Sequence, residues 1–131
     1  ANNPADTNLR GNYGVMLYRN AYWPEAVQEL SYVVKGGLST DGNEMEVINL
    51  TPEAPLRIAE YYFTYALALA RLDQCGEALQ IAQLIISRIP ADELAVDNAN
   101  EVTNRCQQNL SAPLSTPTVE STPEAEATPT P

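Results

Sequence analysis

The chain has 131 residues, which is enough for one domain, and its 17 acidic and 7 basic side chains give a net charge of −10. Histidine is absent, so the commonest general base and metal ligand is missing. An acidic chain without a basic cluster argues against binding to nucleic acid or to anionic membranes. No apolar run approaches the length of a membrane span.

Two helices are predicted in the first third of the chain. The first is expected to end near Arg19 and to begin at Asp6 or Thr7, either of which can cap it. After a short turn, Pro24 suits the first turn of a second helix. This helix is predicted to run to about Lys35 and to end at Gly36 and Gly37.

The segment 36–54 is a long polar connection. Its acidic residues partly match a calcium-binding loop, but Met45 occupies a ligand position and Pro52 stands where the closing glutamate is required. We therefore predict no metal site in it. Because long loops within a compact domain are often functional, the segment is a candidate contact surface.

The stretch 59–90 is the most apolar part of the chain. Its first half, 59–72, is apolar almost all round, so a helix there must be covered on every side. In its second half, 77–89, apolar residues recur on one side at helical spacing. The polar break with Gly76 is typical of two antiparallel helices joined by a tight turn, and Pro90 ends the second helix.

The remaining residues divide into a helix and a tail. A helix is predicted from Ala91 to about Leu110, and its polar face suits the closed end of a helical stack. Residues 111–131 are rich in Ser, Thr and Pro and cannot bury a core, so they are predicted to be extended. Such stalks are often O-glycosylated, with a naked flexible linker as the alternative. The candidate acceptors are Thr116, Thr118, Thr122, Thr128 and Thr130.

Two cysteines fall at the start of one predicted helix, Cys75, and near the end of the next, Cys106. Antiparallel packing brings these helix ends together, so a disulfide is favoured over two free buried thiols. Its loop of about thirty residues would stabilise the fold by roughly 3–4 kcal/mol in the chain-entropy model. The chain begins at Ala1, and we expect a mature, secreted chain that has lost a signal peptide, with a truncated chain as the alternative.

The stretch 59–90 resembles the tetratricopeptide repeat. That family has a small residue in the first helix, then a large apolar residue, an Ala early in the second helix, two apolar residues and a closing Pro. The residues at these places are Ala66, Leu69, Ala78, Ala82, Ile85 and Pro90, with Cys75 and Ala82 where the family usually has aromatic residues. A second copy lies about fifty residues earlier, at Tyr13, Gly14, Leu17, Ala21, Trp23, Ala26, Leu30 and Val33.

The resemblance implies an all-α fold. Residues 1–110 would form a short right-handed α-solenoid of two antiparallel helix pairs plus a C-terminal capping helix, with an insertion at 36–54 and an extended tail at 111–131. It also implies a concave groove lined by the first helix of each pair. The groove candidates are Asn12, Leu17, Tyr62 and Leu69.

Several surface sites are indicated more weakly. Sequons for N-linked sugars occur at Asn49 and at Asn109. Aromatic side chains are enriched at interfaces, and three tyrosines outside the family's core positions are candidate interface residues, with burial as the alternative. These are Tyr18, Tyr22 and Tyr32.

No catalytic constellation is present. Ser and Thr have no His partner, no phosphate-binding Gly loop occurs, and the acidic pairs at i, i+4 are typical of solvated helix faces. We therefore expect no enzyme, no cofactor and no metal. The favoured hypothesis is a secreted structural protein that associates with itself, head to tail as a filament subunit, because two helix pairs are fewer than a stable solenoid usually needs. The alternative is a monomeric extracellular adaptor that holds a peptide of another protein in its groove.

Overall fold

The computed structural model of this chain describes residues 4–39 and 41–111. In these residues a two-stranded antiparallel hairpin, β1 (Gly37–Leu38) with β2 (Glu44–Met45), stands between the second and third helices. The predicted all-helical class is confirmed, and the hairpin is an addition that the sequence did not indicate. The extended tail was expected at 111–131, but Ser111 is the last residue of α5, and 112–131 lie outside the described residues. The five helices of the described ranges are α1 (Pro4–Arg19), α2 (Trp23–Lys35), α3 (Leu56–Arg71), α4 (Cys75–Arg88) and α5 (Glu93–Ser111).

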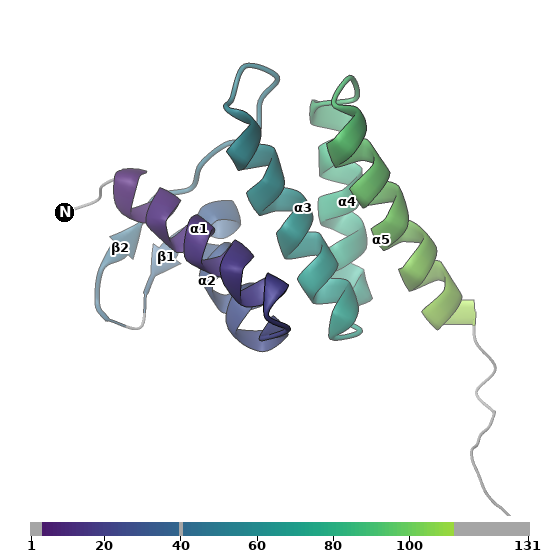
Figure 1. Cartoon of the computed structure of the whole chain (residues 1–131), viewed down its shortest axis with the longest axis horizontal. Coiled ribbons are helices and arrows are strands. Elements are labelled where there is room, and N and C mark those ends of the chain that lie inside the picture. The colour runs from purple at the N-terminus through teal and green to yellow at the C-terminus, as the bar shows by residue number, and fades with distance from the viewer. Residues whose placement is uncertain (1–3, 40, 112–131) are drawn as a thin grey trace, which may run out of the picture.

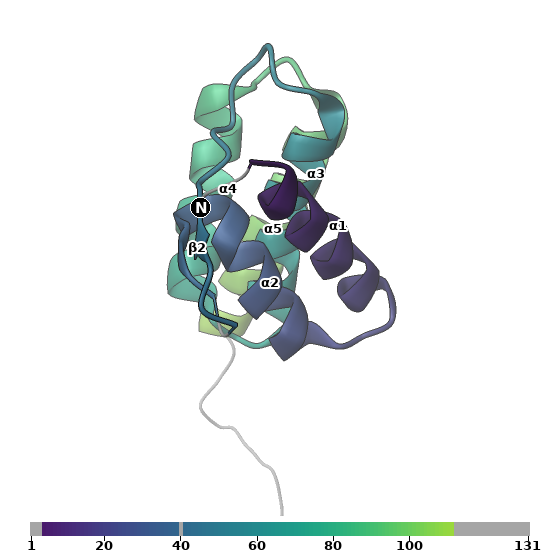
Figure 2. The same cartoon turned by 90° about the vertical axis from the view of Figure 1, so that its left-hand side faces the viewer.

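The helices lie in two layers. Figure 1 shows α1, α3 and α5 side by side with α2 and α4 behind them, and in the turned view of Figure 2 α1 and α3 lie to the right of α2 and α4. α3 is in the middle and contacts all four other helices. This position explains why its sequence is apolar on nearly every side: a helix that is covered all round has no face left for water.

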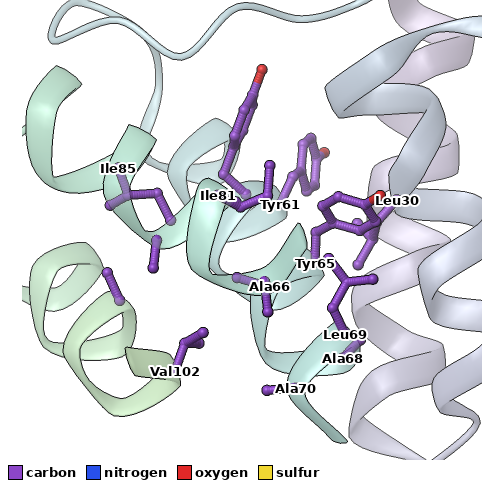
Figure 3. Packing of buried hydrophobic residues seen from close by; sticks show 14 of the residues in the cluster. Leu30, Tyr61, Tyr65, Ala66, Ala68, Leu69, Ala70, Ile81, Ile85 and Val102 are labelled. Atoms are coloured by element: carbon purple, nitrogen blue, oxygen red, sulfur yellow. The ribbon is translucent and has the colours of Figure 1, made fainter. Parts of the chain in front are cut away.

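The core is built around α3. Tyr61 and Tyr65 are fully buried, and in Figure 3 Tyr65 and Leu69 lie beside Leu30 of α2. The hydroxyl of Tyr61 finds a partner on α1, because it donates to the side-chain oxygen of Asn12 at 2.7 Å. Buried tyrosine hydroxyls need such partners, since an unpaired one would lose its hydration without compensation.

The turns of the two helix pairs have the same backbone geometry. Ala21 and Asp73 take left-handed conformations with φ of 65° and 59°. In the first turn the amide of Tyr22 donates to the carbonyl of Leu17 at 2.9 Å, and in the second the amide of Gln74 donates to the carbonyl of Leu69 at 2.9 Å. Both are Schellman motifs, which satisfy the last carbonyls of a helix.

Glycine therefore does not make the second turn. Gly76, expected in the break between helices, lies in the first turn of α4, and Asp73 takes the left-handed position. A short polar side chain can adopt this conformation by bonding locally. The start of the first helix also differs: α1 begins at Pro4, so Thr7 does not cap it but is buried, with its hydroxyl oxygen unpartnered in the described part of the chain.

The connection between the pairs is held by polar contacts. Arg10 of α1 pairs with Glu29 at 3.0 Å and with Asp41 of the hairpin turn at 2.7 Å. Its guanidinium also lies 5.5 Å from the centre of the Tyr32 ring. Further along, the Tyr62 hydroxyl donates to the carbonyl of Ile48 at 2.6 Å. These contacts position the end of the connection against α3.

Cys75 and Cys106 lie at disulfide-bonding distance, with their Cα atoms 5.5 Å apart. Cys75 is the first residue of α4, and Cys106 lies in the last turns of α5. Both side chains are buried. The antiparallel packing of α4 and α5 thus produces the pairing that the sequence favoured over two free thiols.

The close approach of α1 and α2 at Gly14 gives a first testable prediction. A Cβ at Gly14 would lie 2.6 Å from Cγ of the fully buried Leu30. We expect Gly14→Ala to lower the free energy of unfolding by about 1–2 kcal/mol, since overpacking outweighs the gain in helix propensity. Gly76→Ala is the matched control, because a Cβ there meets no atom within 4 Å. It should raise the stability by about 0.5–1 kcal/mol in urea denaturation. Equal effects of the two substitutions would contradict this packing.

The disulfide gives a second prediction. The double variant Cys75→Ala/Cys106→Ala should lose roughly 3–4 kcal/mol of unfolding free energy, because the bridge closes a loop across a sequence separation of 31. Urea denaturation of the oxidised chain and of the variant measures the difference. A reducing agent should destabilise the native chain and leave the double variant unchanged. An unchanged native chain under full reduction would show that the bridge contributes nothing.

Candidate functional site

An apolar hollow lies at the end of the molecule where α3 begins and α4 ends. It has a volume of about 310 Å³ and is enclosed by the last residues of the connection, the first turn of α3 and the turn between α4 and α5. In Figure 1 these segments face one another at the top of the view. The apolar lining includes Leu50, Pro52, Leu56, Ala59, Ile89 and Pro90.

A second hollow continues the first between α3 and α5. It has a volume of about 330 Å³ and shares Leu56, Ala59 and Asp92 with the first. Phe63 of α3 and Leu94 of α5 add apolar surface to it. The two hollows adjoin each other and are here together named the α3–α5 groove, which is the main candidate for a functional site.

Two leucines of this groove are largely exposed. Leu56 keeps 80% of its surface accessible and Leu94 keeps 65%. Single exposed apolar residues are common, but two that border one apolar depression are typical of a binding surface. Neither leucine supports the core, so their exposure leaves apolar surface for a partner.

The charged residues at the rim are already engaged. Asp92 caps α5, because its carboxylate accepts a hydrogen bond from the amide of Ala95 at 3.1 Å. Glu60 accepts a hydrogen bond from Arg19 at 3.0 Å. Arg57 donates to the side chain of Asn8 at 3.2 Å. The groove therefore offers apolar contact with a polar border.

A side-chain hydrogen bond and two prolines lie at the edge of the groove. The Arg88 guanidinium donates to the carbonyl of Leu50 at 3.3 Å and so ties the connection to the end of α4. Pro55 precedes the first residue of α3, and Pro90 follows the end of α4. Proline favours an extended residue before it and cannot continue a helix, which fits the position of both residues at helix ends beside the hollow.

The residues that the family resemblance placed in a groove lie elsewhere. Leu17, Tyr62 and Leu69 are buried, so they line no open groove. Leu17 and Leu69 pack into the core at the helix-ending turns, and Tyr62 faces the connection. Asn12 is exposed, but its side chain accepts the Tyr61 hydroxyl. The groove is lined by different residues of α3 and α5, and the sequence offered one signal for them, a leucine on the polar face of α5.

The three candidate interface tyrosines have different surroundings. Tyr22 is 57% exposed at the turn before α2, and Tyr18 is half-buried against the core. Tyr32 is only 7% exposed, because its ring packs under the Arg10 guanidinium. Tyr32 is therefore not part of an open surface, and of the three only Tyr22 presents most of its side chain to a partner.

An apolar stripe on α1 was not expected as a surface. Leu9, Tyr13 and Met16 recur at helical spacing and are 65%, 48% and 50% exposed. α1 is the first helix of the array and contacts α2, α3 and β2, which leaves this side uncovered. The open face of α5 at the other end of the array differs, because it exposes polar residues such as Asp97 and Glu101.

The candidate sugar sites fall mostly beyond the described side chains. Asn49 is exposed on the connection, beside Leu50 and Thr51 of the groove. Asn109 lies within α5, and its side chain is outside the described residues. The candidate O-glycosylation sites Thr116, Thr118, Thr122, Thr128 and Thr130 are also outside the described residues.

A cluster of coupled polar side chains lies away from the groove. Glu77 of α4 accepts the Tyr65 hydroxyl at 2.6 Å and pairs with Lys35 of α2 at 2.7 Å. Burial raises the pKa of Tyr65, and the hydrogen bond to Glu77 raises it further. Burial also acts to raise the pKa of Glu77, but the hydrogen bonds from Lys35 and Tyr65 outweigh it and lower that pKa below 4.5. The cluster joins α2, α3 and α4.

The lowered pKa of Glu77 gives a third prediction. A carboxylate with a depressed folded pKa stabilises the fold above its unfolded value and loses this contribution as the pH falls below it. We expect Glu77→Gln to cost about 1 kcal/mol at pH 7, reduced by its partial exposure, and less as the pH falls below 4.5. Urea denaturation between pH 7 and pH 3 measures this. Glu46→Gln, on the exposed connection, is the control and should change little. A Glu77→Gln deficit that is constant with pH would refute the coupling.

The described residues contain no group of three or more His, Cys, Asp or Glu side chains placed to hold a metal ion. Among helices α1 to α5 as described, none combines the length and apolar character that a membrane crossing requires. Comparisons with protein-family models, curated proteins and solved structures find no match to this chain.

Proposed function

We propose that this chain is a non-catalytic protein-binding module that holds an apolar segment of another chain in the α3–α5 groove. The observation that carries the proposal is the groove itself, an apolar depression bordered by the exposed leucines Leu56 and Leu94. We also propose that the two helix pairs are tetratricopeptide-like repeats. The repeated Schellman turns and the close contact at Gly14 support that interpretation.

The chemistry of the groove favours a peptide over a small polar ligand. Its surface is mainly apolar and its nearby charges are engaged with other residues, so contact area rather than hydrogen bonding supplies the free energy of binding. Covering the exposed parts of Leu56 and Leu94 would contribute about 1–2 kcal/mol each. This is enough for micromolar binding when a few partner residues contribute similar amounts.

The proposed setting is extracellular. A buried cysteine pair at bonding distance is compatible with an oxidising compartment, where disulfides persist. We propose in addition that the threonines next to prolines in the tail carry O-linked sugars. The intact mass of the secreted chain tests this: a mass above that of the bare polypeptide, which a deglycosylating treatment lowers, is the expected result, and the bare mass would exclude glycosylation.

A binding experiment tests the groove. Random dodecapeptides displayed on phage are selected on the full chain, and the Kd of the selected peptides is measured by fluorescence polarisation. We expect Leu94→Asp and Leu56→Asp to weaken binding at least about tenfold, because each places a charge in an apolar contact. Leu38→Asp is the matched control, since Leu38 is an exposed leucine on β1 and does not line the groove. It should leave binding unchanged.

A result with the two groove variants can also contradict the proposal. Peptides that bind the native chain and both groove variants with the same Kd would place binding elsewhere. Circular dichroism of each variant shows whether it remains folded. Both groove leucines are exposed, so their substitution should leave the helical signal and the urea midpoint close to those of the native chain.

The stripe on α1 favours a second candidate function, a self-associating structural subunit. Leu9, Tyr13 and Met16 would be covered if α1 packed against another copy. The open face of α5 is polar and does not complement the stripe, so contact between two stripes would close a dimer rather than extend a filament. Sedimentation of Met16→Asp against the native chain tests this, and a dimer that survives the substitution would remove α1 from the contact.

A further inference from the structure

The groove and the end of α5 lie at opposite ends of the molecule. Leu94, which borders the groove, is in the first turn of α5, whereas Ser111 is its last residue. A helix rises 1.5 Å per residue, so these two residues are separated by about 26 Å along the helix axis. Any segment that follows Ser111 starts from the end of the molecule that is far from the groove.

This separation limits what the tail can reach. A fully extended chain spans at most about 3.6 Å per residue, so Leu114 can lie no further than about 11 Å from Ser111. It therefore cannot enter the groove of its own chain. Val119 is the only other large apolar residue after Ser111, and it would arrive only at almost full extension, about 29 Å.

The chemistry of the tail segment matches the groove. Residues 107–119 contain no charged side chain, whereas the rest of this chain is strongly acidic. Leu114 follows Pro113 and lies three residues before Pro117. Proline restricts the unbound segment, so less conformational entropy is lost when it binds. An uncharged segment also avoids repulsion from Glu60, Asp92 and Glu93 near the groove.

We propose that the α3–α5 groove binds residues 112–117 of a second copy of this chain, with Leu114 between Leu56 and Leu94. The ring of Phe63, half-buried in the groove, provides the aromatic surface on which proline-rich segments dock. This inference rests on the proposed function of the groove and names its partner. This contact requires no second apolar face on the folded domain. The exposed face of α5 is polar and could not supply one.

The contact is heterologous, because a tail of one copy enters a groove of the next. Each chain carries one groove and one tail segment, and the tail starts about 26 Å from the groove. Repeating such a contact links copies head to tail into an open filament, or into a ring where the rotation between copies closes. The short array of helices thereby gains neighbours without stacking its terminal helices.

Two complementary variants test the inference. Leu114→Asp removes the tail contact but keeps the groove, and Leu94→Asp removes the groove contact but keeps the tail. We expect the full native chain to form species larger than a dimer as its concentration rises to about 1 mM, and each variant alone to stay monomeric. An equimolar mixture should stop at dimers, because only one tail and one groove remain compatible. Sedimentation velocity measures all four samples.

The controls separate this contact from others. Leu38→Asp should associate as the native chain does, because this exposed leucine lies outside the groove. A mixture of the two variants that remains monomeric overturns the inference. Association that persists in both single variants and disappears in Tyr13→Asp also overturns it, because the contact would then lie on α1.

A peptide experiment distinguishes failure of the inference from failure of the proposed function. A labelled peptide of residues 111–119 is titrated with the Leu114→Asp chain, which cannot supply its own tail residue. Saturable binding that Leu94→Asp weakens at least about tenfold supports the inference. If this peptide does not bind while phage-selected peptides still bind in the groove, the inference fails and the proposed function stands. If neither binds, both fail.

Discussion

The burial of α3 on all sides is the constraint on which the rest of this structure depends. Its buried tyrosines are too large and too polar to be covered by one neighbour, so α1 accepts the Tyr61 hydroxyl while Glu77 of α4 accepts that of Tyr65. α2 and α5 cover the remaining faces. The helix pairs are thus joined by one shared core, and the disulfide between α4 and Cys106 fixes the last helix to it.

The same constraint explains where the groove is. α3 is buried along most of its length, and Pro55 precedes its first turn. Leu56, the first residue of α3, stays 80% exposed and lines the groove together with Leu94 of α5. An exposed apolar surface at this end costs the core little, because substitution of an exposed residue removes few buried contacts. The buried and the exposed apolar residues of α3 are thus separated along one helix.

Much of the fold was predictable because it depends on local patterns. The apolar periodicity, the glycines after α2 and the prolines gave the helices to within a few residues, and antiparallel packing favoured the pairing of Cys75 with Cys106. The hairpin was not predictable, since two-residue strands carry no periodic signal. Neither was the turn residue: Asp73 rather than Gly76 adopts the left-handed conformation, which depends on where the preceding helix ends.

The sequence by itself determined the helical class, the central place of α3 and the opportunity for a disulfide, because hydrophobic pattern and helix-ending residues act locally. Only the tertiary structure decided which side chains remain accessible. It buried Tyr32, Leu17 and Leu69 and left Leu56 and Leu94 exposed around one depression. Exposure depends on how far one helix extends beyond the next and on what each turn covers, and these are properties of packing between segments distant in the chain.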